Sequence, residues 1–168
     1  MKGFSYIPLP NFIMRKKAIL NMENKDDKCF QWSILRYLHP LQKHDARISD
    51  LKKYENELNF KGIEFPVKSE DITKFENQNP GIPGKNVFSV NESNKIYPLR
   101  LNKKDCQKSI DLFLFKQDEK SHYSLIKNFS RLTRSQITSD KNRKIYICKR
   151  RLLPFTKEDL LEKHITNC

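Results

Sequence analysis

The stretch Asn24-Lys-Asp-Asp-Lys-Cys29-Phe-Gln-Trp-Ser-Ile-Leu-Arg-Tyr-Leu-His39-Pro40 predicts a helix that begins at a cysteine and ends before a proline. Asp26 and Asp27 precede it and can accept hydrogen bonds from the free N–H groups of a first turn. Large side chains recur along it at helical spacing. They are Phe30, Ile34, Tyr37 and Leu38. We expect this helix to pack on the core of the domain.

The cysteine at the start of the predicted helix defines the first candidate site. The positive end of a helix dipole favours a thiolate, which attacks carbonyls or binds metals. Far downstream, His122 lies in the alternating run 121–128, which predicts a strand. A cysteine on a helix followed by a histidine on a strand is the chain order of papain-like thiol hydrolases, with Cys29 as nucleophile and His122 as base. Asn24 lies close enough in sequence to help an oxyanion. The alternative is a packed cysteine and a structural histidine.

Composition favours a polyanionic partner. The chain has 168 residues, with 33 Lys and Arg against 20 Asp and Glu, for a net charge of +13. Nucleic acid is the first candidate, and a membrane is disfavoured because no apolar run approaches the roughly 18 residues of a spanning helix. The alternative is a basic surface with no dedicated ligand. Four scattered cysteines and the lack of a signal peptide predict an intracellular location, compatible with the nucleus.

The pattern along the chain predicts an α+β fold in four parts. Residues 1–23 form an extended arm and first strand, 24–132 the α+β domain, 133–145 a basic linker, and 146–168 a small ββα unit. Beyond the cysteine helix, short helices are expected near 48–58 and at 69–76, the second capped by Ser69. Four runs predict an antiparallel meander, and they are 86–90, 95–101, 109–115 and 122–127. The cysteine helix packed on this sheet permits a papain-like arrangement.

The C-terminal stretch 146–168 has the spacing of a zinc finger. Six positions of that pattern are in register, and they are Tyr146, Cys148, Phe155, Leu161, His164 and Cys168. The position of the second cysteine holds Arg151, whose guanidinium cannot become a ligand. Cys148, His164 and Cys168 therefore predict an incomplete zinc site. Either water fills the fourth position, or the small apolar core holds the unit without metal.

A basic stretch with few acids lies between the last predicted strand and the finger-like unit. Its cations are Lys127, Arg131, Arg134, Lys141, Arg143, Lys144, Lys149, Arg150 and Arg151. Tyr123, Phe129 and Tyr146 are interleaved with them, a pattern typical of binding to a phosphate backbone with rings available for stacking. A solvated linker is the alternative.

Segments spread over nearly the whole chain resemble one family. These segments are Ser5–Pro10, Lys16–Ile19, Asn24–Phe30, Trp32–Ile34, Leu58–Ile63, Phe65–Val67, Asp71–Ile72, Phe75–Glu76, Ser121–Tyr123, Ile126–Leu132 and the finger-like unit. The chain resembles transposable-element-derived proteins of arthropod genomes, similar to Polinton or Maverick polyproteins, in which this region lies upstream of a protein-primed type-B DNA polymerase. The family carries a second finger cysteine at the position of Arg151. The resemblance implies an element-encoded, nucleic-acid-associated role and the downstream polymerase region as a partner, although these residues contain no polymerase motif.

Two functions of different class follow. In the first, the chain is an accessory module that binds DNA or RNA mainly through backbone phosphates. In the second, it is a thiol protease or related hydrolase that uses Cys29 and His122. The second needs a group that orients the histidine. Asn128 is too distant along its strand, and Asp111 on the neighbouring run is a substitute that no local feature selects.

Overall fold

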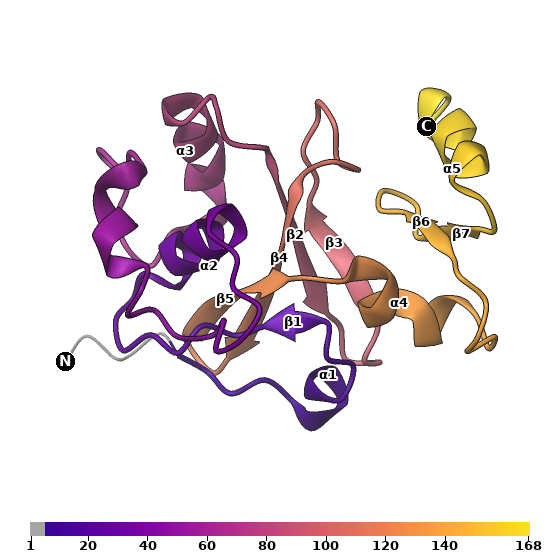
Figure 1. Cartoon of the computed structure of the whole chain (residues 1–168), viewed down its shortest axis with the longest axis horizontal. Coiled ribbons are helices and arrows are strands. Elements are labelled where there is room, and N and C mark those ends of the chain that lie inside the picture. The colour runs from indigo at the N-terminus through magenta and orange to yellow at the C-terminus, as the bar shows by residue number, and fades with distance from the viewer. Residues whose placement is uncertain (1–5) are drawn as a thin grey trace.

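A mixed five-stranded sheet forms the centre of the structure, a computed structural model that describes residues 6–168. Its strand order is β1-β5-β4-β2-β3. The strands are β1 (Ile19–Leu20), β2 (Lys85–Val90), β3 (Ile96–Arg100), β4 (Ile110–Gln117) and β5 (Lys120–Ile126). The predicted α+β class is confirmed, and the two-stranded β6–β7 unit with its helix lies at one end of the molecule (Figure 1).

Alternation along β4 and β5 divides the core into two layers. Leu114 and Tyr123 pair across the strands and face α2 (Cys29–Leu38) and α3 (Ile72–Gln78). Phe113, one residue along, faces the opposite layer, which holds α1 (Asn11–Met14) and α4 (Phe129–Ile137). Because successive side chains of a strand point to opposite faces, both layers are built from the same two strands.

The expected meander is wrong at one connection. β2 and β3 form an antiparallel hairpin, but β4 pairs with β2 in parallel, so residues 101–109 cross from the edge strand back past β2. The first five residues of β4 are all buried. A run that is buried on both faces belongs in the middle of a sheet, so β4 takes a central place beside β2 and does not follow β3 through a short hairpin loop.

Two helices form in segments that were predicted to be an extended arm and a linker. Residues 1–5 of the predicted arm lie outside the described residues, and α1 forms a helical turn where extended chain was expected. α4 occupies the start of the predicted linker, because Asn128 caps it by accepting a hydrogen bond from the Arg131 N–H at 2.9 Å. The linker is therefore reduced to 138–145.

The short predicted helices form in altered places. Residues 48–58 contain the 3-10 helix Lys52–Glu57, and a 3-10 turn at Ser69–Asp71 leads into α3 without a cap from the Ser69 side chain. The cysteine helix begins at Cys29 as predicted. Tyr37, expected to face inward, is 43% exposed.

Arg36 fixes the irregular chain that follows α2. Its side chain is buried and donates to both carboxylate oxygens of Asp50, at 2.8 and 2.9 Å. It also donates to the backbone carbonyls of His39, Asp45 and Arg47, at 2.8, 2.7 and 2.6 Å. One guanidinium thus satisfies several acceptors in a segment with little regular structure.

Replacing Arg36 with Met should lower the free energy of unfolding by about 3 kcal/mol, because several backbone acceptors and Asp50 lose their donor. Urea unfolding measures the change. Arg47→Met, at an exposed side chain, is the matched control and should stay within about 0.5 kcal/mol of the parent. Equal effects of the two changes would contradict the structural role of Arg36.

Candidate functional site

The structure brings Cys29 to the backbone of β5. Cys29 is fully buried at the first position of α2, and its Sγ accepts a hydrogen bond from the Tyr123 N–H at 3.3 Å. The Cα of His122 lies about 2.4 Å from that amide nitrogen, so Sγ is no more than about 6 Å from the His122 backbone. The two residues paired from sequence order are therefore neighbours in the fold.

His122 is held by a residue that the sequence analysis missed. Its Nε2 lies 2.5 Å from Oδ1 of Asn21, which directly follows β1. An amide oxygen only accepts, so the imidazole donates from Nε2, and in the neutral ring Nδ1 carries the lone pair. The Ser124 hydroxyl donates to the same Oδ1 at 3.3 Å, and the Asn21 amide donates to the Ile7 carbonyl at 3.0 Å. Asn21 is thus fixed from several sides.

The two suggested orienting residues lie elsewhere. Asp111 accepts from the Asn86 amide at 2.9 Å and pairs with Lys149, and Asn128 caps α4. The signal for Asn21 is its place just past β1. The pairing of Leu20 with Leu125 sets Asn21 opposite Ser124 and beside His122, and a two-residue strand gives almost no periodicity from which to predict that pairing.

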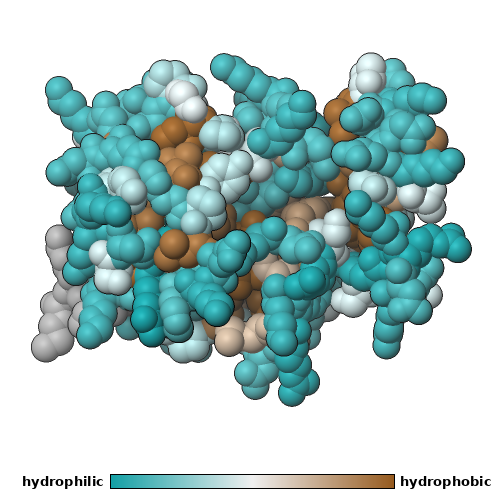
Figure 2. Space-filling view, viewed as in Figure 1, coloured by the Kyte–Doolittle hydropathy of each residue, from teal (hydrophilic) through white to brown (hydrophobic). Residues whose placement is uncertain are grey.

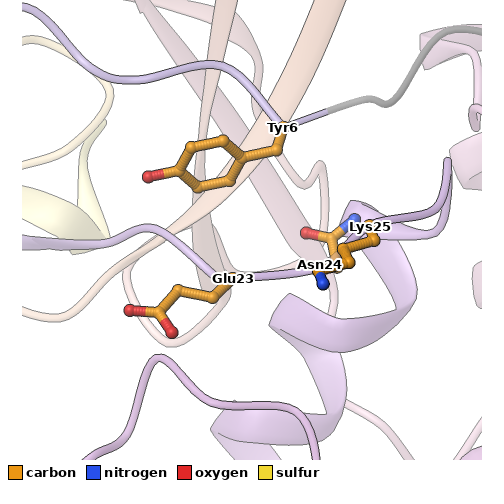
Figure 3. Close-up of a pocket in the computed structure, with 4 residues that line it drawn as sticks. All are labelled: Tyr6, Glu23, Asn24 and Lys25. Carbon is orange, nitrogen blue, oxygen red and sulfur yellow. The ribbon is translucent and has the colours of Figure 1, made fainter.

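Asn24 is buried near the start of α2, but its amide is engaged locally. Its Nδ2 donates to the carbonyl and to Oδ1 of Asp26, at 2.9 and 3.1 Å. A cavity of about 600 Å³ is lined by Tyr6, Glu23, Asn24 and Lys25, which Figure 3 shows as sticks. The Tyr6 ring packs edge-on against His122, with 5.7 Å between ring centroids. The chain before α1 therefore covers the histidine.

A second candidate site is a group of metal-ligand side chains in the finger-like unit. This unit consists of β6 (Tyr146–Cys148), β7 (Leu153–Phe155) and α5 (Glu158–Thr166), as its spacing predicted. The ligand atoms of Cys148, His164 and Cys168 lie within 4.8 Å of one another, and the two Sγ atoms are 4.0 Å apart. Thiolates around a tetrahedral ion with bonds of about 2.3 Å are roughly 3.8 Å apart, so the group can hold a metal ion.

The surroundings of the group agree with metal binding. Nε2 of His164 is buried and has no hydrogen-bond partner among the described residues. Burial raises the pKa of the Cys148 thiol, against the lowering effect of backbone hydrogen bonds from Arg151 and Arg150, and the neighbouring Cys168 also raises it. A bound cation would reverse that preference, because a coordinated thiol loses its proton. Arg151 is exposed and adds no ligand.

The nine predicted phosphate contacts differ in burial and in their partners. Lys127 is exposed and pairs with Asp45 at 2.5 Å, whereas Lys149 pairs with Asp111 at 2.6 Å in a nearly buried contact. Arg134 donates to the backbone carbonyls of residues 140 and 143. The remaining cations are exposed, and they are Arg131, Lys141, Arg143, Lys144, Arg150 and Arg151.

The chain just after α1 adds cations to α4. Lys16 Nζ donates to the Leu132 carbonyl at 2.8 Å and to the Ser135 hydroxyl at 3.0 Å. Burial lowers the pKa of Lys16, and nearby Lys95 lowers it further, as expected where cations gather. We call the exposed cations of these adjoining segments the α4 basic surface, and they are Arg15, Lys17, Arg131, Lys141, Arg143 and Lys144. Long hydrophilic side chains project from the region of α4 in Figure 2.

No helix in the described part of the chain is long and apolar enough to cross a membrane. Comparisons with protein-family models, curated proteins and solved structures find no match for this chain.

Proposed function

We propose that the chain binds DNA or RNA through the phosphate backbone, using the α4 basic surface. The observation that carries this proposal is the gathering of cations from three segments, since the chain after α1 lies along α4 and Arg134 ties residues 140–143 to the same helix. Asp140 is an acid within this region, and its pair with Arg143, at 3.6 Å, is well exposed. A net charge of +13 adds long-range attraction for a polyanion.

Backbone contact fits this surface better than base readout. α5, the helix that a finger would insert into a groove, starts with Glu158 and Asp159, which would repel the phosphates lining that groove. The cations of the α4 basic surface lie partly on irregular chain, which follows a phosphate backbone without reading base edges. The accessory role in a mobile element, with a downstream polymerase region as partner, is part of this proposal and is supported by the family resemblance.

A change of Arg131→Glu with Lys144→Glu should weaken binding to unrelated duplexes and single strands at least about tenfold. The slope of log affinity against log salt concentration should also become less steep, by roughly one for each phosphate that the variant no longer neutralises. Fluorescence anisotropy at two salt concentrations measures both quantities. Lys52→Glu with Lys53→Glu makes the same change in net charge on exposed residues of the α2 side. An equal loss in that control would show that net charge alone is responsible.

The hydrogen bond between His122 and Asn21 favours a second candidate function, that of a thiol hydrolase. In this mechanism Nδ1 of His122 takes the thiol proton of Cys29, and the thiolate attacks a substrate carbonyl. Asn21 keeps the proton on Nε2 and fixes the plane of the ring, as the third member of such a triad does. The side-chain amide of Asn24 already donates to Asp26, so it does not suit the predicted role of stabilising an oxyanion. Because Cys29 is fully buried, a substrate reaches it only if the covering chain around Tyr6 moves.

If Cys29 and His122 act together, Cys29 should alkylate faster than Cys106 near neutral pH, and Asn21→Ala should slow it as His122→Ala does. Peptide mapping after timed iodoacetamide treatment across pH gives the rates. Asn24→Ala is the comparison and should leave the rate near that of the parent. A Cys29 that stays inert until the domain is denatured would instead be a packing residue.

We also infer that the metal held by the finger-like unit is zinc, because two thiolates and an imidazole at tetrahedral separations are its preferred donors. One equivalent should bind the reduced chain and raise its thermal midpoint. His164→Ala should lower the affinity at least about 100-fold, whereas Arg151→Ala should not change it. Competition with a chromophoric chelator measures the affinities, and equal values for these two variants would contradict the site.

A further inference from the structure

The loop between β3 and β4 is fastened to the finger-like unit on both sides of Cys148. Gln107 Nε2 donates to the Ile147 carbonyl at 2.9 Å, and its Oε1 accepts from the Lys149 N–H at 3.2 Å. Lys149 Nζ donates to the Gln107 carbonyl at 3.0 Å. A side chain that bonds the residues before and after Cys148 brings its own neighbours close to that thiol.

The residue before Gln107 is Cys106, a buried free thiol. Its carbonyl accepts from the Asn86 amide of β2 at 2.6 Å, so its backbone is anchored to the central sheet. A cavity of about 280 Å³ is lined by Cys106, Cys148 and Cys168 together. Segments distant in sequence thus present three thiols to one space at the junction between the sheet and the finger-like unit.

We propose that Cys106 is the fourth ligand of the metal site formed by Cys148, His164 and Cys168, in place of the finger position that Arg151 occupies. The Cys106 thiol lies outside the group whose atoms are within 4.8 Å of one another. A change of its side-chain rotamer toward the shared cavity closes a Cys3His tetrahedron. Binding of Zn²⁺ releases three thiol protons to solvent and forms three Zn–S bonds and one Zn–N bond, with no change of oxidation state.

The charges around the cavity suit this ligand set. A divalent ion with three thiolates and a neutral imidazole carries a net charge of −1. Lys104 and Arg150 line the same cavity together with one acid, Asp105, so the charged side chains of the lining sum to +1 and offset that charge. With water as the fourth ligand the site would instead be neutral. The surroundings therefore favour the thiolate-rich site over an open three-ligand site.

Such a site would differ from an ordinary zinc finger in the parts of the chain that the metal links. A finger closes its metal site within its own hairpin and helix. Here one ligand would come from the crossover loop of the main domain, so the metal would link the finger-like unit to the sheet. This assignment rests on the zinc site proposed above, and the experiments below separate failure of the two.

X-ray absorption on the zinc-loaded, reduced full chain counts the ligands directly and needs no substitution. We expect three sulfur atoms at about 2.3 Å and one nitrogen at about 2.0 Å. Two sulfur atoms with two lighter ligands would overturn the role of Cys106 while leaving the zinc site in place. A chain that binds no zinc would overturn both.

A mutant cycle tests the same ligand independently. Cys106→Ser should lower zinc affinity more than about 100-fold, a larger loss than an outer-shell change causes. Adding Arg151→Cys to that variant should restore affinity, whereas Arg151→Cys alone should change it little, since the fourth position is already filled. Lys103→Ala, an exposed residue of the same loop that does not line the cavity, should affect affinity least and controls for loop disturbance. Wild-type affinity in Cys106→Ser, or an equal gain from Arg151→Cys in both backgrounds, would refute the proposal.

Discussion

The burial of residues 29–36 of α2 on all sides is the constraint on which the rest of the structure depends. Every residue from Cys29 to Arg36 is buried, and a buried polar group without a partner costs free energy. Trp32 Nε1 therefore donates to the Asp26 carboxylate at 3.1 Å, and Gln31 Nε2 donates to the Glu55 carbonyl at 2.9 Å. With the bonds of Arg36, these contacts dictate the course of the chain before and after the helix, where regular secondary structure is sparse.

The same constraint positions the thiol. α2 is held near its start through Trp32 and near its end through Arg36, so Cys29 meets β5 at a fixed point, where Tyr123 donates to it. His122 is fixed separately, through Asn21 and the β1–β5 pairing. Two rigid elements thus position the thiol and the imidazole of the proposed hydrolase, as a preorganised site requires. Burial of the thiol makes access the feature that separates a hydrolase from a packed cysteine.

The local sequence pattern predicted the helices and strands better than it predicted which of them lie side by side. The cysteine helix, the four long strands and the ββα unit follow from hydrophobic period and spacing, which act within one segment. The parallel pairing of β2 with β4 could not be predicted in this way, since it depends on which strand best fills the middle of the sheet. The contacts of Asn21, Lys16 and Cys106 were missed for the same reason. Each lies beside its partners only through pairings between segments distant in sequence.

The crossover that corrects the predicted meander also explains how the finger-like unit is held. If β3 and β4 formed a hairpin, residues 101–109 would be a loop at the edge of the sheet. In the structure these residues form the crossover, which runs beside β6. The unit has few buried side chains, with Ile147, Cys148 and Leu161 buried and Phe155 half-buried, so its two short strands and helix need support from outside. Lys149 and Asp111 supply a nearly buried ion pair, although burial raises the pKa of Asp111 against the opposing effect of Lys149. Such a pair fixes register more than it adds stability. Docking on the sheet therefore relieves the unit of the need to fold around a metal alone, and this accounts physically for its tolerance of Arg151 where the finger pattern has a cysteine.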